Sequence, residues 1–159
     1  MVSAAASEAI SGVLGRLVQD CRASTGMVLY RAGQIIVSEG TTYRDELIML
    51  GALVAGTYAS TREMARILHE DNFRMLLQEG ARENIFTQAV GDHWLVSVIF
   101  DEHTHLGLVK VLCERATTDL SHTLVVVLEE NQQRLREHDS TLARVVEDTI
   151  DLIFRKDDA

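Results

Sequence analysis

The proline-free stretch from Asp45 to Leu68 sets the strongest limit on the structure of this chain. Its apolar residues recur with the helical period, which predicts a single long helix with two distinct stripes. The stripe predicted to face the core comprises Leu47, Leu50, Val54, Tyr58, Thr61, Ala65 and Leu68. The opposite stripe comprises Ile48, Ala52, Gly56, Ala59, Glu63 and Arg66.

The second stripe carries Ala and Gly where a solvent-facing helix usually carries Lys, Glu and Arg. Because small side chains let another backbone come close, this stripe is interpreted as a contact surface for a partner. The alternative, which the pattern leaves open, is an ordinary helix that is buried on most sides.

The residues before this helix predict another helix and a hairpin. Residues 3–21 are rich in Ala and Ser and place apolar side chains at helical spacing, so we expect an amphipathic helix there. Residues 27–31 and 34–40 read as two strands, and Gly33 supplies the positive φ that a tight turn between them needs.

The residues after it predict three strands and two helices. Residues 73–83 are expected to form a connection with a short helical piece before Gly80. The expected strands cover 83–90, 93–100 and 107–114. A helix is expected over 115–137, then a break at 138–140 with Ser140 as the N-cap of a last helix. That helix places apolar residues on one face, namely Leu142, Val145, Val146, Thr149, Ile150 and Ile153, and acidic residues on the other, namely Glu147, Asp148 and Asp151.

The predicted fold class is therefore α+β, with two or three layers. The expected order is helix, two strands, helix, three strands and helix, with a five-stranded antiparallel sheet and an extra C-terminal helix. No proline-rich linker divides the chain. We expect one domain over residues 1–137 and a helical extension over residues 138–159.

The charge balance excludes several partners. The chain has 15 basic and 24 acidic residues, a net charge of −9, and no basic cluster, which argues against nucleic acid and anionic membrane surfaces. No apolar run approaches the ~18 residues that span a bilayer, and no export signal is seen. Cys21 and Cys113 have no C-x-x-C companion, so we expect buried free thiols in a reducing cytoplasm.

The sequence predicts no active site, cofactor or metal. It contains no glycine-rich phosphate-binding motif, and no serine or cysteine lies in a nucleophile motif. His103 and His105, with Asp101, are metal-ligand types, but their segment reads as a solvated turn. Arg62 and Arg66 could reach into the active site of a partner protein and assist phosphate transfer there. The alternative, which we favour, is that they lie on an exposed face and pair with acidic neighbours such as Glu63.

Three segments carry a resemblance to a known family: LGALVAGTYASTREMARILHEDNF, LLQEGARENIF and VSVIFDEHTHLGLVKV. Together with the order of the elements, they resemble the Roadblock / dynein light chain family and, within it, the bacterial MglB-like proteins, which regulate the small Ras-like GTPase MglA. The resemblance covers about residues 12–120. Its most specific parts are residues 50–56 and 100–109. The turn at Arg31-Ala32-Gly33 departs from the pattern because it lacks an acidic residue beside the arginine.

The resemblance implies a two-fold homodimer that serves as a platform for a GTPase. The strand at 83–90 would pair with its copy, and the helices at 45–68 would lie side by side. The residues implied to pair in the dimer strand are Asn84, Ile85, Phe86 and Thr87. The residues implied to contact the GTPase are Ala52, Gly56, Ala59, Glu63 and Arg66. The segment from Ser140 to Phe154 is implied to contact it as well.

The function implied is stimulation of GTP hydrolysis by positioning the GTPase's own arginine and glutamine, with two copies of this chain per GTPase. The chain would then have no active site of its own. A non-catalytic scaffold or adaptor of the same fold, binding another protein, is the first alternative. A metal-dependent enzyme near His103 and His105 is the second.

Overall fold

The computed structural model describes residues 2–155 and contains three helices and five strands in this part of the chain. The N-terminal half comprises α1 (Ala4–Asp20), β1 (Thr25–Tyr30), β2 (Ile35–Gly40) and α2 (Arg44–Ile67). The C-terminal half comprises β3 (Met75–Glu79), β4 (Glu83–Val90), β5 (Trp94–Asp101) and α3 (Leu106–Arg155). The order of helices and strands is the one that the sequence predicts.

The strands form one antiparallel sheet in the order β2-β1-β5-β4-β3. Gly33 lies in the β1–β2 turn with φ +104°, and its N–H donates to the Tyr30 carbonyl at 2.9 Å. The predicted hairpin is therefore confirmed. β2 and β3 are the two edge strands, and each has an edge that no strand within residues 2–155 covers.

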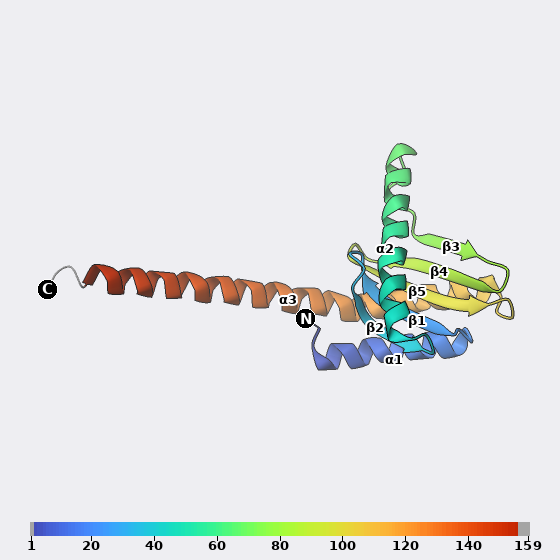
Figure 1. Cartoon of the computed structure of the whole chain (residues 1–159), viewed down its shortest axis with the longest axis horizontal. Coiled ribbons are helices and arrows are strands. Elements are labelled where there is room, and N and C mark those ends of the chain that lie inside the picture. The colour runs from blue at the N-terminus through green and yellow to red at the C-terminus, as the bar shows by residue number, and fades with distance from the viewer. Residues whose placement is uncertain (1, 156–159) are drawn as a thin grey trace.

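The helices cover both faces of the sheet and make three layers (Figure 1). On one face, Val54 and Tyr58 of α2 pack over strand residues such as Leu29 and Leu95. On the other face, α1 and the first half of α3 pack over the side chains that alternate with these. β5 lies at the centre and is buried on both faces from Trp94 to Phe100. This arrangement confirms the predicted α+β class.

Two of the predicted elements are wrong. Residues 107–114 form the first turns of α3 rather than a strand. Their buried members, Val109 and Cys113, are four residues apart and continue the spacing of Ala116 and Leu120, so a helix buries them on one face. The strand that completes the five-stranded sheet is instead β3. It lies in the segment where a connection was expected, and it places Leu77 opposite Phe86 of β4.

This topology corrects the predicted dimer strand. β4 pairs with β5 along its whole length, and residues 84–88 also pair with β3. Asn84, Ile85, Phe86 and Thr87 therefore have a neighbouring strand on each side and no edge to offer a second copy. On this side of the sheet, the open edge belongs to β3.

The predicted break at 138–140 is also wrong, because α3 runs through it without interruption. The Ser140 hydroxyl donates to the Glu137 carbonyl at 2.9 Å, and Thr141 donates to the same carbonyl at 2.8 Å. Both hydroxyl groups therefore find hydrogen-bond acceptors within the helix, and Ser140 does not act as an N-cap. The division between residues 137 and 138 stays a prediction.

The second half of α3 extends away from the three layers (Figure 1). Every residue from Gln132 to Arg155 is exposed. Among the described residues, no helix, this one included, combines the length and apolar character needed to cross a membrane.

Candidate protein interface

The core-facing stripe of α2 is largely as predicted. Leu47, Val54, Tyr58, Thr61 and Ala65 are buried, and Leu50 is half-buried against the same cluster. The prediction is wrong for Leu68. The helix ends at Ile67, and Leu68 is its C-cap and is 64% exposed.

The predicted contact residues all lie on the outer side of α2. Ala52, Gly56, Ala59, Glu63 and Arg66 are exposed, and helical spacing brings them onto one face. A Cβ added at Gly56 would meet nothing within 4 Å, so packing within this chain does not require a glycine there. The contrast is Gly51 on the inner side, where a Cβ would lie 3.1 Å from the Gly33 carbonyl oxygen. The small outer residues are therefore free for contact with another molecule.

The sequence reasoning missed a second set of exposed residues on this face. Met49, Leu53, Met64 and Ile67 are apolar side chains between 56% and 71% exposed. Their spacing places them on one stripe through Gly56 and Ser60, beside the predicted one. The helical period of the sequence also indicates this second outer stripe, but the prediction considered only the first one. Together the two stripes make a broad face of small and apolar residues, with Glu63 and Arg66 near its end, which is the kind of surface that marks a protein contact.

Charged side chains gather where α2 ends. Arg31, Arg62 and Arg66 line a depression of about 890 Å³ together with acidic residues of the neighbouring segments, namely Glu63, Glu70, Asp71 and Asp92. The Arg66 Nε lies 3.1 Å from the Glu63 carboxylate, and both side chains are exposed. Because arginines and carboxylates are mixed, the depression does not select a phosphate group.

Arg31 is held in place at this end. Its guanidinium donates to the Gly91 carbonyl at 3.0 Å and lies 5.4 Å from the centre of the Tyr58 ring. These contacts connect the β1–β2 and β4–β5 turns to α2, so the arginine has a structural role.

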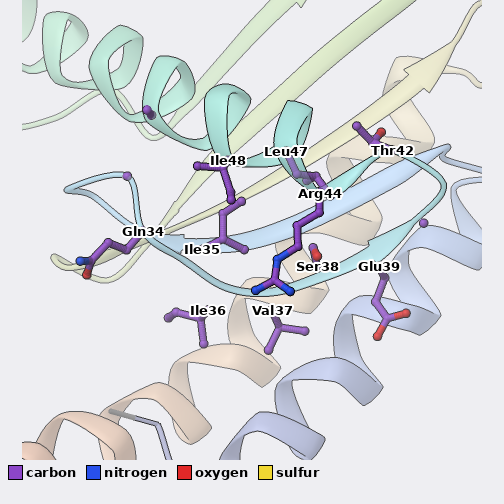
Figure 2. A pocket seen from close by; sticks show the side chains of 13 residues that line it. Gln34, Ile35, Ile36, Val37, Ser38, Glu39, Thr42, Arg44, Leu47 and Ile48 are labelled. Carbon is purple, nitrogen blue, oxygen red and sulfur yellow. The ribbon is translucent and has the colours of Figure 1, made fainter.

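A groove of about 700 Å³ lies along β2, beside the first turns of α2 (Figure 2). Ile35 and Ile48 face each other across it, and the Arg44 side chain reaches over β2 toward Ser38. Among the residues that line it, only Glu39 and Arg44 are charged. This composition offers mainly apolar contact.

The polar residues considered for chemistry are not brought together. His103 and His105 are exposed, and the Asp101 carboxylate accepts the His103 backbone N–H at 2.9 Å. Within residues 2–155, no group of three or more His, Cys, Asp or Glu side chains is arranged to hold a metal. Cys21 and Cys113 are buried, and burial raises their pKa values to about 11 and about 12. Neither thiol is a ready nucleophile at neutral pH.

Comparisons with known proteins agree with this architecture. The family model described as Roadblock/LC7 domain matches residues 11–100. Myxococcus xanthus MglB superposes with a TM-score of 0.75 at 29% identity, covering 80% of this chain and 95% of that protein. The gliding protein MglB of Thermus thermophilus gives 0.73 at 27% identity, covering 77% and 93%. An MglB in a tetrameric arrangement gives 0.73 at 26% identity, covering 77% and 93%. Comparison with curated sequences gives no significant match.

Proposed function

This chain belongs to the Roadblock/LC7 domain family, and on this basis we propose that it is a homodimeric regulator of a small Ras-like GTPase. In this proposal, the chain stimulates GTP hydrolysis by the GTPase. The likeness to MglB structures at 26–29% identity supports this proposal over other roles in the family.

The single observation that carries the proposal is the outer face of α2. It combines small residues at Ala52, Gly56 and Ala59 with the exposed apolar side chains of Met49 and Leu53. Small residues allow close approach, and apolar side chains supply burial energy on contact. A rigid helix packed on a sheet can hold such a surface in one geometry.

We propose that the chain positions groups of the GTPase and inserts none of its own. Arg66 is paired with Glu63 at 3.1 Å, and the depression around it mixes arginines with carboxylates, so it does not select a triphosphate. Holding the GTPase's own arginine and glutamine in their reactive positions lowers the barrier through orientation alone. Two copies per GTPase would present two α2 helices to it.

The open edge of β3 supports the homodimer. An edge strand with unpaired backbone groups pairs readily with an identical strand, and a two-fold contact uses the same surface twice. The tetrameric arrangement named for one similar structure supports self-association in this group. We place the dimer in the cytoplasm, where the two free thiols would stay reduced.

The proposal is tested by single-turnover GTP hydrolysis with a Ras-like GTPase from the same source, with and without this chain. Ala59→Arg places a long charged side chain in the middle of the α2 face, so we expect it to abolish both acceleration and complex formation. Ala9→Arg is the matched control, because Ala9 is exposed on α1, on the opposite side of the sheet.

Three results would count against it. No acceleration and no complex with the intact chain would exclude the GTPase partner. A complex without acceleration would favour the adaptor function. If Ala59→Arg separated the homodimer, this part of the face would belong to self-association.

A further inference from the structure

The open edge of β2 forms one wall of the groove beside α2 (Figure 2). All residues of β2 line this groove, Val37 included, although the Val37 side chain is buried in the cluster on the α1 side of the sheet. The backbone edge of the strand is therefore itself part of the wall. The opposite wall is made by the first turns of α2, with Leu47 and Ile48. A strand edge and side chains of α2 thus meet in one place.

Two residues of β2 direct their backbone N–H and C=O groups to this open edge. The Tyr30 N–H donates to the carbonyl of the residue just before β2 at 2.9 Å, so Tyr30 faces β2. Bonding alternates along an antiparallel strand, so Met27 and Thr25 face β5 instead. Ser38 and Gly40 lie opposite these two residues and receive no ladder bond from β1. Both are exposed, and their backbone groups can bond to a further strand.

A strand added at this edge places alternate side chains on the α2 face of the sheet. Met27 packs in the cluster beneath α2, and directly opposed residues share a face, so Ser38 belongs to that face too. An added residue opposite Ser38 has the same orientation, and so does the one two positions away. Ile35 lies two ladder steps from Ser38, because Ile36 is an extra residue at an irregularity in the pairing. The second side chain therefore reaches Ile35 and Ile48, which face each other and suit an aliphatic group (Figure 2).

Arg44 supplies a positive charge at the same edge. Its side chain reaches over β2 toward Ser38 (Figure 2). The single ion pair within residues 2–155 joins Arg66 to Glu63, so Arg44 has no carboxylate partner in this part of the chain. A carboxylate on the added residue opposite Ser38 would lie beside the guanidinium. The edge is thus complementary to an acidic side chain.

A second copy of β2 does not supply this carboxylate. The acidic residue of β2, Glu39, accepts the Ser11 hydroxyl of α1 at 3.1 Å and so lies on the other face of the sheet. A two-fold pair of β2 strands would instead bring the Arg44 side chains of both copies onto one face, where they repel each other. The charge pattern therefore favours a strand from a different protein.

We propose that the β2 edge binds an extended peptide segment of a partner protein as an additional antiparallel strand. Antiparallel pairing continues the pattern of the sheet and is slightly more stable than parallel pairing. In chain order the segment carries an acidic residue, any residue and an aliphatic residue. The acidic side chain meets Arg44, and the aliphatic one enters between Ile35 and Ile48. Backbone bonds supply affinity and the two side chains supply specificity.

This contact lies at the opposite edge of the sheet from β3, and its test needs no GTPase. The probe is the fluorescein-labelled peptide KTVEVIVTK, blocked at both ends, in which glutamate, valine and isoleucine form the pattern. Fluorescence anisotropy with the full chain should show saturable binding. A peptide with lysine in place of the glutamate should bind roughly tenfold more weakly, because an attraction becomes a repulsion.

Arg44→Glu should reverse this preference, so that the lysine peptide binds more tightly than the glutamate peptide. Arg134→Glu is the matched control, because Arg134 is exposed on the free half of α3, and the preference should stay that of the unsubstituted chain. No binding of either peptide at about 1 mM would overturn the proposal. An unchanged preference in Arg44→Glu would overturn it as well.

The second experiment tests the backbone pairing. Peptides are made with N-methyl groups on the glutamate and isoleucine amides, which face β2 in the proposed register, or on two valine amides, which face solvent. We expect the first peptide to lose binding and the second to keep it. Amide exchange measured by NMR should slow at Ser38 and Gly40 when the unmodified peptide binds. Equal binding of the two methylated peptides, or protection at β3 instead of β2, would contradict the proposal.

Discussion

The hydroxyl of Tyr58 donates a hydrogen bond of 2.7 Å to the backbone carbonyl of Phe73. Tyr58 comes from the middle of α2, and Phe73 lies two residues before β3. The bond therefore ties the helix of the candidate interface to the strand that forms the open edge of the sheet. Both proposed contact elements are held in one relative position.

Tyr58→Phe should lower the free energy of unfolding by about 1–2 kcal/mol, because the Phe73 carbonyl loses its partner while the ring stays packed. Tyr43→Phe provides the control, since that side chain is 79% exposed. Urea unfolding of the two variants at pH 7 measures the difference. Equal stabilities would show that the bond contributes nothing.

Gly56→Ala should raise the stability of the chain by up to about 1 kcal/mol, because alanine favours a helix interior and its Cβ meets nothing at this position. Gly40→Ala should have the opposite effect. Gly40 has φ +120°, and a Cβ there would overlap the Ser24 carbonyl oxygen. Thermal unfolding at low protein concentration compares the two. A loss of stability in Gly56→Ala would show that this glycine already packs closely in the isolated chain.

Hydrogen exchange distinguishes the two strands considered for the dimer. As the protein concentration rises, we expect added protection at amides of β3, whose outer edge is open, and no change at residues 84–88 of β4, which pair on both sides. Peptide-resolved mass spectrometry over a concentration series measures this. Concentration-dependent protection confined to β4 would contradict the sheet order.

The two thiols should make stability fall at high pH. Burial raises the pKa of Cys21 to about 11, with a smaller effect of Asp20, and burial raises that of Cys113 to about 12. Below the unfolded value of 9.0, both states keep these protons and the thiols contribute no pH dependence. Above it, the unfolded chain ionises while the folded chain does not, so the free energy of unfolding decreases from about pH 9 toward pH 11 and 12.

Urea unfolding at pH 8 and pH 10 under reducing conditions measures this decrease. The limit is about 1.4 kcal/mol per pH unit for each thiol. A Cys21→Ala/Cys113→Ala chain should lose less stability over the same interval. If its pH dependence matched that of the unsubstituted chain, the thiols would be ionising in the folded state as well.

Much of the candidate interface could be predicted from local periodicity. The helical period alone separated buried residues such as Val54 and Tyr58 from exposed ones such as Ala52 and Ala59. The Gly33 turn could be predicted for the same reason, because its positive φ is a local requirement. Met49 and Leu53 show the limit of this reasoning, since an exposed apolar side chain looks like a core residue until its surroundings are known.

The α+β class and the two faces of α2 thus follow from the amino-acid sequence alone, because they depend on residues within a few turns of one another. Which segments pair and which stay open follows only from the three-dimensional packing. Residues 107–114 have side chains that suit a strand or a buried helix, and contact with α1 and the sheet selects the helix. Whether β3 or β4 is the edge depends on neighbours distant in sequence. The open edge of β3 is a consequence of that long-range pairing.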